Sequence, residues 1–166
     1  MGKMKEEFTK MREQEETINQ NQIDMKKVKS LKKVKEPVKE TRKDILRRLF
    51  NENNLVEEDV YKDKRGFIII TRTGIDKIVT KQNITIAYEV IKLDKDMVVI
   101  KAVASMKVGD TQRNMMSFGE SNETNLMGGA KGYPVCMAEK RAMSRVVLKI
   151  SGLYEQGVFG QGEMVD

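Results

Sequence analysis

The spacing of apolar and polar residues changes several times along this 166-residue chain, and each change predicts a different element. Residues 1–40 are rich in Lys, Glu, Gln and Asn and hold few apolar side chains, so they bury too little surface to offset the entropy cost of ordering. We therefore expect residues 1–40 to form a basic arm that is disordered or marginally helical, closed by Pro37.

A short amphipathic helix is predicted directly after this arm. Thr41 is a residue type that caps helices well, and the apolar residues Ile45, Leu46, Leu49 and Phe50 have the spacing of one helix face beside a basic stripe.

A strand followed by a short helix is predicted next. Residues 66–71 are a dense run of β-forming side chains, and residues 73–79 have the spacing of a short helix with Thr73 as its candidate cap. Arg72 precedes this helix, where its charge is available to a phosphate at the helix amino end.

Three consecutive strands are predicted over residues 84–93, 97–107 and 111–118. They are separated by two turn-like tripeptides, Asp94-Lys95-Asp96 and Val108-Gly109-Asp110, so we expect an antiparallel meander.

A Gly-, Asn- and Ser-rich loop over residues 119–132 leads to the clearest helix, residues 135–153, with Pro134 at its first turn. Its apolar residues fall on one face: Val135, Ala138, Ala142, Val146, Ile150 and Leu153. The predicted fold is α+β: an antiparallel β-β-β meander packed against a long C-terminal helix, with a short preceding strand-helix unit and a basic N-terminal arm. We expect a single domain over residues 41–155 and a flexible tail over residues 156–166.

Positive charge is concentrated at the start of the chain. Residues 1–50 hold 15 Lys and Arg against 9 Asp and Glu, whereas residues 51–166 hold 16 of each sign. A basic segment on a neutral domain is typical of an arm that seeks phosphates, and it also fits a tail that only keeps the protein soluble.

Composition disfavours several classes of protein. The single Cys136 permits no intrachain disulfide, and no apolar run is long enough for a membrane span or a signal peptide, so we expect a cytoplasmic protein. The chain has no histidine and no phosphate-binding glycine motif that precedes a helix. We therefore expect no enzymatic activity, no cofactor and no metal ion.

The candidate chemistry lies on the long helix, where Arg141, Arg145 and Lys149 recur every four residues and Lys140 flanks them. Such a row can follow a nucleic-acid backbone without reading its sequence. The alternative interpretation is a solvated helix face on which Glu139 pairs with the cations.

A second candidate lies just before that helix, where Lys131 and Tyr133 place a cation and an aromatic ring beside helix amides that favour anions. Tyr133 is able to stack on a base, and it is equally able to pack over the helix entrance.

The order of these elements, with Ser117-Phe118-Gly119-Glu120 at the third strand and Ala138-Glu139-Lys140-Arg141-Ala142 on the long helix, resembles the Rad fifty-two superfamily of single-strand annealing proteins. The resemblance covers roughly residues 60–155 and is closest to the small phage and prophage members, which would act in a bacterial host cell. It implies a β-β-β-α core that assembles into rings or filaments and holds single-stranded DNA in a basic groove without a nucleotide cofactor. It places the basic row on the family's basic helix and Arg72 near the family's basic position.

The leading prediction is therefore an ATP-independent protein of DNA recombination and repair. It is predicted to bind single-stranded DNA as a homo-oligomer and to promote strand annealing or act as a recombination mediator. Recombination or replication proteins are its expected protein partners. Composition does not separate DNA from RNA. The predicted DNA-binding residues are Arg72, Lys131, Tyr133, Lys140, Arg141, Arg145 and Lys149. The alternative is a structural or interaction protein whose basic arm and amphipathic helix dock a protein partner.

Overall fold

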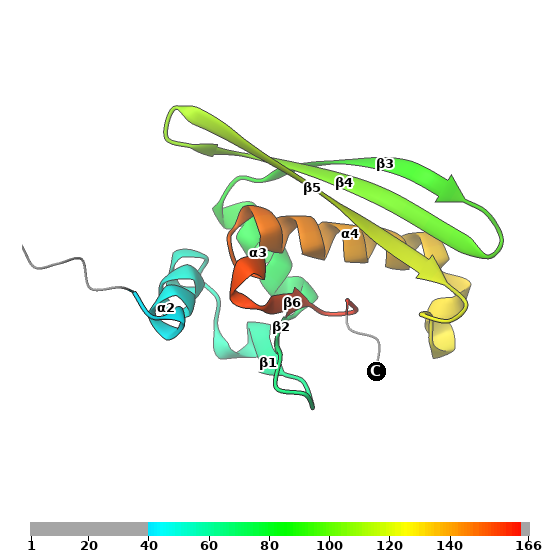
Figure 1. Ribbon diagram of the computed structural model, residues 1–166, viewed down its shortest axis with the longest axis horizontal. Coiled ribbons are helices and arrows are strands. Elements are labelled where there is room, and N and C mark those ends of the chain that lie inside the picture. The colour runs from blue at the N-terminus through cyan, green and yellow to red at the C-terminus, as the bar shows by residue number, and fades with distance from the viewer. Residues whose placement is uncertain (1–39, 164–166) are drawn as a thin grey trace, which may run out of the picture. The chain divides into compact units, whose positions relative to one another are not determined.

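A single long helix, α4, runs between two small sheets in the computed structural model (Figure 1). The structure describes residues 40–163, so the predicted arm over residues 1–40 lies, apart from Glu40, outside the described residues, as do residues 164–166. The described elements follow in chain order: α2 (Arg42–Glu52), η1 (Glu57–Asp59), β1 (Val60–Lys62), β2 (Ile68–Ile70), α3 (Arg72–Lys81), β3 (Thr85–Leu93), β4 (Met97–Val108), β5 (Thr111–Asn122), η2 (Gly128–Gly132), α4 (Pro134–Ile150), η3 (Tyr154–Gln156) and β6 (Val158–Gly160).

The meander sheet, in the order β3-β4-β5, is antiparallel throughout. The predicted meander and its packing against the C-terminal helix are confirmed, and so is the α+β class. The third strand runs four residues beyond its predicted end at Phe118, because Gly119 to Asn122 continue the pairing with β4, as in the pair Val99↔Glu120.

Alternation along β4 explains how the meander sheet packs on α4. Every second residue over the first two thirds of this strand is buried: Val98, Ile100, Ala102 and Ala104. The matching face of β5 carries small residues, and a Cβ atom at Gly119 would lie 2.0 Å from the carbonyl oxygen of Ala138 on α4. Glycine at position 119 therefore sets how closely α4 approaches the sheet.

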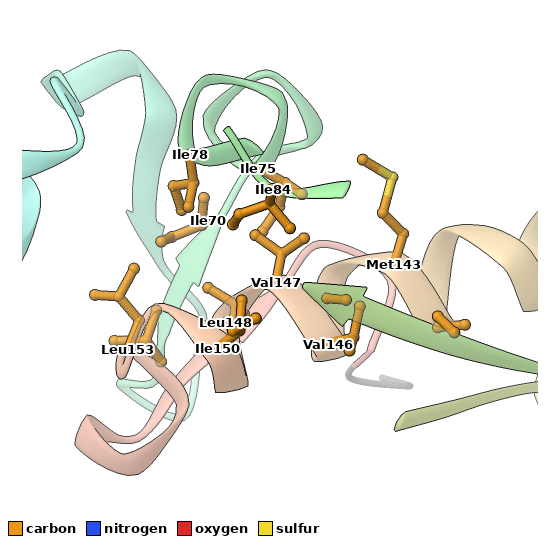
Figure 2. Packing of buried hydrophobic residues seen from close by; sticks show 14 of the residues in the cluster. Ile70, Ile75, Ile78, Ile84, Met143, Val146, Val147, Leu148, Ile150 and Leu153 are labelled. Atoms are coloured by element: carbon orange, nitrogen blue, oxygen red, sulfur yellow. The ribbon is translucent and has the colours of Figure 1, made fainter. Parts of the chain in front are cut away.

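The opposite side of α4 carries the rest of the hydrophobic core. Figure 2 shows Ile70 of β2 and Ile75 and Ile78 of α3 in one cluster with Val147 and Leu148 of α4, and all five are fully buried or nearly so. Helix α4 is thus enclosed on two sides along its carboxyl half, and few of its side chains there reach solvent.

The caps of the two shorter helices gave one correct and one wrong prediction. Thr41 caps α2 as predicted, in a reciprocal arrangement with Asp44. Helix α3 begins at Arg72, so its cap is Thr71, whose hydroxyl accepts a hydrogen bond from Gly74 N at 3.2 Å. Thr73 lies inside the first turn, because Thr71 is the last residue with extended backbone.

The prediction of a flexible tail from residue 156 was wrong for the part that the structure describes. Helix α4 ends at Ile150, and the chain then reverses so that Val158, which is fully buried, begins the strand β6. Strand β6 pairs in parallel with β2 to complete the mixed sheet, in the order β1-β2-β6, and Gln161 N extends this ladder by donating to Ile70 O at 2.9 Å. We refer to residues 157–163 as the C-terminal segment.

None of the helices within residues 40–163 combines the length and the apolar character needed to cross a bilayer.

Candidate nucleic-acid interface

Arg141 was predicted to contact phosphates, but its guanidinium is directed into the protein. The residue is 7% exposed and donates hydrogen bonds to Gly162 O at 2.8 Å and to Glu120 O at 2.7 Å. It also donates to the side-chain oxygen of Asn125 at 2.8 Å and to the Asn125 carbonyl at 2.7 Å. These four bonds use donors that a phosphate would need.

Arg145 and Lys149 continue in the same direction along α4. Arg145 donates to Phe118 O at 2.7 Å and forms an ion pair with Glu163 at 3.1 Å. The ammonium of Lys149 donates to the Ser117 hydroxyl at 3.2 Å. We refer to Arg141, Arg145 and Lys149 as the cation ladder.

The cation ladder closes the outer edge of the meander sheet. Strand β5 is an edge strand, and the carbonyls of Phe118 and Glu120 that face away from β4 accept hydrogen bonds from the two arginines. Edge carbonyls left unpaired in a partly buried site cost free energy, so these contacts stabilise the fold. The interpretation as a solvated face was wrong for Arg141, which is buried, whereas Arg145 and Lys149 are partly buried and donate to atoms of β5.

Glu163 supplies the counter-charge that neutralises part of the ladder. Its side chain is 2% exposed, and it accepts hydrogen bonds from Arg145 and from Gly160 N at 3.0 Å. Burial raises the pKa of Glu163 above its ordinary value, while the charge of Arg145 acts in the opposite direction. The carboxylate of Glu163, in the C-terminal segment, thus lies beside Arg145, where a bound phosphate would otherwise be expected.

The other predicted residues of this region remain open to solvent at the amino end of α4. Tyr133 is 70% exposed, and Lys131 and Lys140 are exposed and form no ion pair within residues 40–163. Tyr133 precedes the first residue of α4, and Lys140 lies in the second turn of the helix. We refer to Lys131, Tyr133 and Lys140 as the amino-end cluster.

The exposure of Tyr133 contradicts the alternative in which its ring packs over the helix entrance. Tyr133 is the residue before Pro134 and its side chain makes no capping hydrogen bond. The neighbouring Val135 and Cys136 are exposed as well, so the first turn of α4 is open to solvent.

Lys131 also borders a cavity of about 240 Å³ at the end of the meander sheet, together with Lys95, Asp96 and Glu123. Two cations face two carboxylates there, so the charges do not single out an anion as the occupant.

Arg72 lies apart from the amino-end cluster, at the first residue of α3. Its guanidinium forms an exposed ion pair with Asp76 at 3.2 Å. Such pairs are weak, so the guanidinium is available to exchange Asp76 for a phosphate.

Tyr88 is a candidate residue that sequence reasoning missed. It pairs with Ala102 of β4, yet Ala102 is fully buried while Tyr88 is 42% exposed. The reason is that α4 packs against β4 and β5, whereas β3 extends beyond the area that α4 covers. Partial burial raises the pKa of Tyr88, the charge of Glu139 raises it further, and Arg72 opposes the shift. Tyr88 therefore lies near both α3 and α4, and this position depends on tertiary packing that no local pattern encodes.

Comparisons with known protein families, with curated proteins and with solved structures found no match to this chain. The resemblance to single-strand annealing proteins therefore stays a prediction.

Proposed function

We propose that this protein binds single-stranded DNA and promotes strand annealing, or acts as a recombination mediator, without catalysis and without a nucleotide cofactor. The observation that carries the proposal is the amino-end cluster. It presents an exposed aromatic ring and two exposed cations at and just before the amino end of α4.

These residue types suit a strand that is bound without regard to its sequence. An exposed tyrosine ring can stack on any base, and lysines can contact the phosphates on either side of it. We assign no part in this binding to the cation ladder, because Arg141 is buried and Arg145 and Lys149 donate to atoms of β5. Arg72 and Tyr88 repeat the combination of cation and ring at the flank of α4 and form a second contact region.

Assembly into a homo-oligomer is supported by a difference between the two edges of the meander sheet. The β5 edge is closed by the cation ladder, whereas the β3 edge is open over nine residues. Three large apolar side chains of β3 are half or more exposed: Val90, Ile91 and Leu93. A long apolar edge strand is a template for pairing with another chain, so we assign β3 to contacts between copies.

Fluorescence with two complementary labelled oligonucleotides tests the proposal, because it records binding and annealing rate together. We expect salt-sensitive binding and faster annealing with the full chain. Tyr133→Ala should weaken binding about tenfold, since stacking on a base contributes about 1–3 kcal/mol. Tyr61→Ala is the matched control, because Tyr61 is an exposed tyrosine on the mixed sheet.

The lysines are tested by salt dependence. The double variant Lys131→Gln/Lys140→Gln should lower the slope of log affinity against log salt by about 1 to 2, because two phosphate contacts are removed. Lys64→Gln/Lys107→Gln removes the same charge elsewhere and should leave affinity within about twofold. Absence of binding at low salt overturns the proposal, whereas binding without faster annealing identifies a coating protein or mediator. Parallel measurements with RNA oligonucleotides determine the preferred nucleic acid.

A further inference from the structure

Helix α2 covers the mixed sheet incompletely. Of its apolar residues, Leu49 is buried, while Ile45, Leu46 and Phe50 are only partly buried against the core. A groove of about 550 Å³ lies between α2 and β1. Its lining is mainly apolar with charged residues among it: Lys43, Leu46, Arg47, Phe50, Asn51, Leu55, Val56, Glu57, Val60, Tyr61, Lys62 and Ile68.

One wall of the groove is an edge strand with free backbone groups. Among residues 40–163, strand β1 pairs with β2 alone. The flanking hydrogen bonds, Thr71 N to Asp59 O and Asp63 N to Phe67 O, show that the odd-numbered residues of β1 are the ones bonded to β2. The backbone groups of Val60 and Lys62 therefore point to the free edge. Val60 N is used by Glu57 O, which leaves Val60 O and both groups of Lys62 for a further strand.

The groove is held in shape by an ion pair just before β1, between the buried carboxylate of Asp59 and the partly exposed Lys77. Asp59 accepts hydrogen bonds from the Lys77 ammonium at 2.6 Å and from Val56 N at 3.0 Å. Burial alone would raise the pKa of Asp59, but these hydrogen bonds and the charge of Lys77 hold it below its ordinary value. Because Asp59 stays ionised and bonded, the turn before β1 is held in place.

The charged residues of the groove are mostly basic. Lys43, Arg47 and Lys62 face a single carboxylate, Glu57, along the lining. Arg47 has one contact with Asp44 at 3.5 Å between two exposed side chains, which leaves its charge largely available. An occupant that carries negative charge is therefore favoured.

We propose that this groove docks an extended acidic and apolar segment of a partner protein, which adds as a strand to the free edge of β1. Strand addition supplies backbone hydrogen bonds, and side chains of a strand alternate between its two faces. Apolar side chains of the segment contact Leu46, Phe50 and Val56, and acidic side chains between them reach Lys43, Arg47 and Lys62.

Charge distinguishes this occupant from the chain's own first residues. Residues 1–39 hold 11 Lys and Arg against 7 Asp and Glu, so they carry the same sign as the basic residues of the groove. An acidic segment from another protein is complementary where the arm is not.

The test uses the full chain and a fluorescein-labelled peptide of about ten residues, in which Asp and Leu alternate around a central Phe. A peptide of this length extends past both ends of the short strand β1. Fluorescence anisotropy should show saturable binding, and a counterpart with Lys in place of Asp should bind at least about tenfold more weakly. The double variant Lys43→Glu/Arg47→Glu should weaken binding of the acidic peptide at least about tenfold. The matched control Lys95→Glu/Lys107→Glu should change it less than about twofold.

Backbone methylation of the peptide tests strand addition without altering the protein. Methyl groups on the alternate peptide nitrogens that face β1 should abolish binding, whereas methyl groups on the other nitrogens should not. Circular dichroism melts establish that each variant is folded.

Several results overturn the proposal: equal binding of the acidic and basic peptides, no saturable binding, binding unchanged in Lys43→Glu/Arg47→Glu, or indifference to methylation in both registers. Analytical ultracentrifugation adds one more, since self-association lost in that charge-reversal variant would assign the groove to a second copy. Annealing of DNA should be unchanged in Lys43→Glu/Arg47→Glu, so this inference and the proposed function fail separately.

Discussion

The two ends of α4 carry the same kinds of residue and differ in what they contact. At the amino end, Tyr133 and Lys140 are exposed and form no ion pair among the described residues. From the middle of the helix onward, Arg141 and Arg145 point toward β5 and the C-terminal segment and donate to carbonyl oxygens. Helix α4 therefore leaves Lys140 open to solvent, and from Arg141 onward its cations contact other parts of the protein.

This difference teaches that regular spacing of arginines does not identify a ligand site. Arg141 and its neighbour Lys140 are adjacent in the sequence, yet one is buried and the other exposed. The direction of each side chain is set by α4's rotation against the sheet, and the C-terminal segment decides which of them reach solvent. The four predictions below test that division.

The largest effect is expected from Gly119→Ala, which disturbs the close approach that brings the ladder to the β5 edge. The new Cβ would lie 2.0 Å from Ala138 O and 2.3 Å from Ala142 N, both backbone atoms that cannot rotate away. We expect a loss of about 3 kcal/mol or more in the free energy of unfolding, measured by urea denaturation. Gly129→Ala, where a Cβ meets nothing within 4 Å, is the control and should change stability by less than about 0.5 kcal/mol.

Arg141→Ala should give the next largest effect. It leaves the partly buried carbonyls of Glu120, Asn125 and Gly162 without their donor, so we expect a loss of about 2 to 3 kcal/mol in the free energy of unfolding. Lys140→Ala changes the adjacent exposed residue and should stay within about 0.5 kcal/mol. Equal stability of these two variants would contradict the division of α4 into two regions.

Most of the fold was predictable because local sequence patterns indicate its helices and strands. The meander follows from alternating strands separated by Asp94-Lys95-Asp96 and Val108-Gly109-Asp110, and α4 follows from Pro134 and its apolar periodicity. Strand β6 was missed because three residues after a glycine carry too little local signal, and their place is decided by pairing with β2.

The site was less predictable, since burial of a charged residue depends on distant partners. The acceptors for Arg141 come from Glu120, Asn125 and Gly162, which are 16 to 21 residues away in the chain. Tyr88 likewise became a candidate only when β3 was seen to extend past α4. Spacing identified where cations lie on the helix, and the tertiary structure decided which of them are free.

The dependence of stability on pH tests the contact between the C-terminal segment and the ladder. Burial raises the pKa of Glu163 above its ordinary value of 4.5. The folded protein then keeps a proton that the unfolded chain releases, so this contribution to stability is full below 4.5 and is lost as pH rises through the folded pKa. In the variant Glu163→Gln the side chain is uncharged at every pH, so the variant should not show this loss of stability as pH rises.

The measurement is urea denaturation of both proteins from pH 4 to pH 8. The stability of the natural chain relative to Glu163→Gln should fall with rising pH, with a slope of at most about 1.4 kcal/mol per pH unit. A constant difference would show that folding leaves the pKa of Glu163 unchanged, and a difference that grows with pH would show that the ion pair with Arg145 outweighs burial.

The smallest effect on stability is expected in the amino-end cluster. Tyr133→Ala and Lys140→Gln remove exposed side chains, so each should change the free energy of unfolding by less than about 0.5 kcal/mol. Affinity for a labelled single-stranded oligonucleotide should nevertheless fall in both. Arg145→Gln should show the opposite combination, because it weakens the contacts with Phe118 O and Glu163 and removes no contact with DNA. Arg145→Gln losing affinity while it keeps its full stability would return the ladder to the binding site, since a cation that matters to DNA and not to the fold must be free to leave Phe118 O.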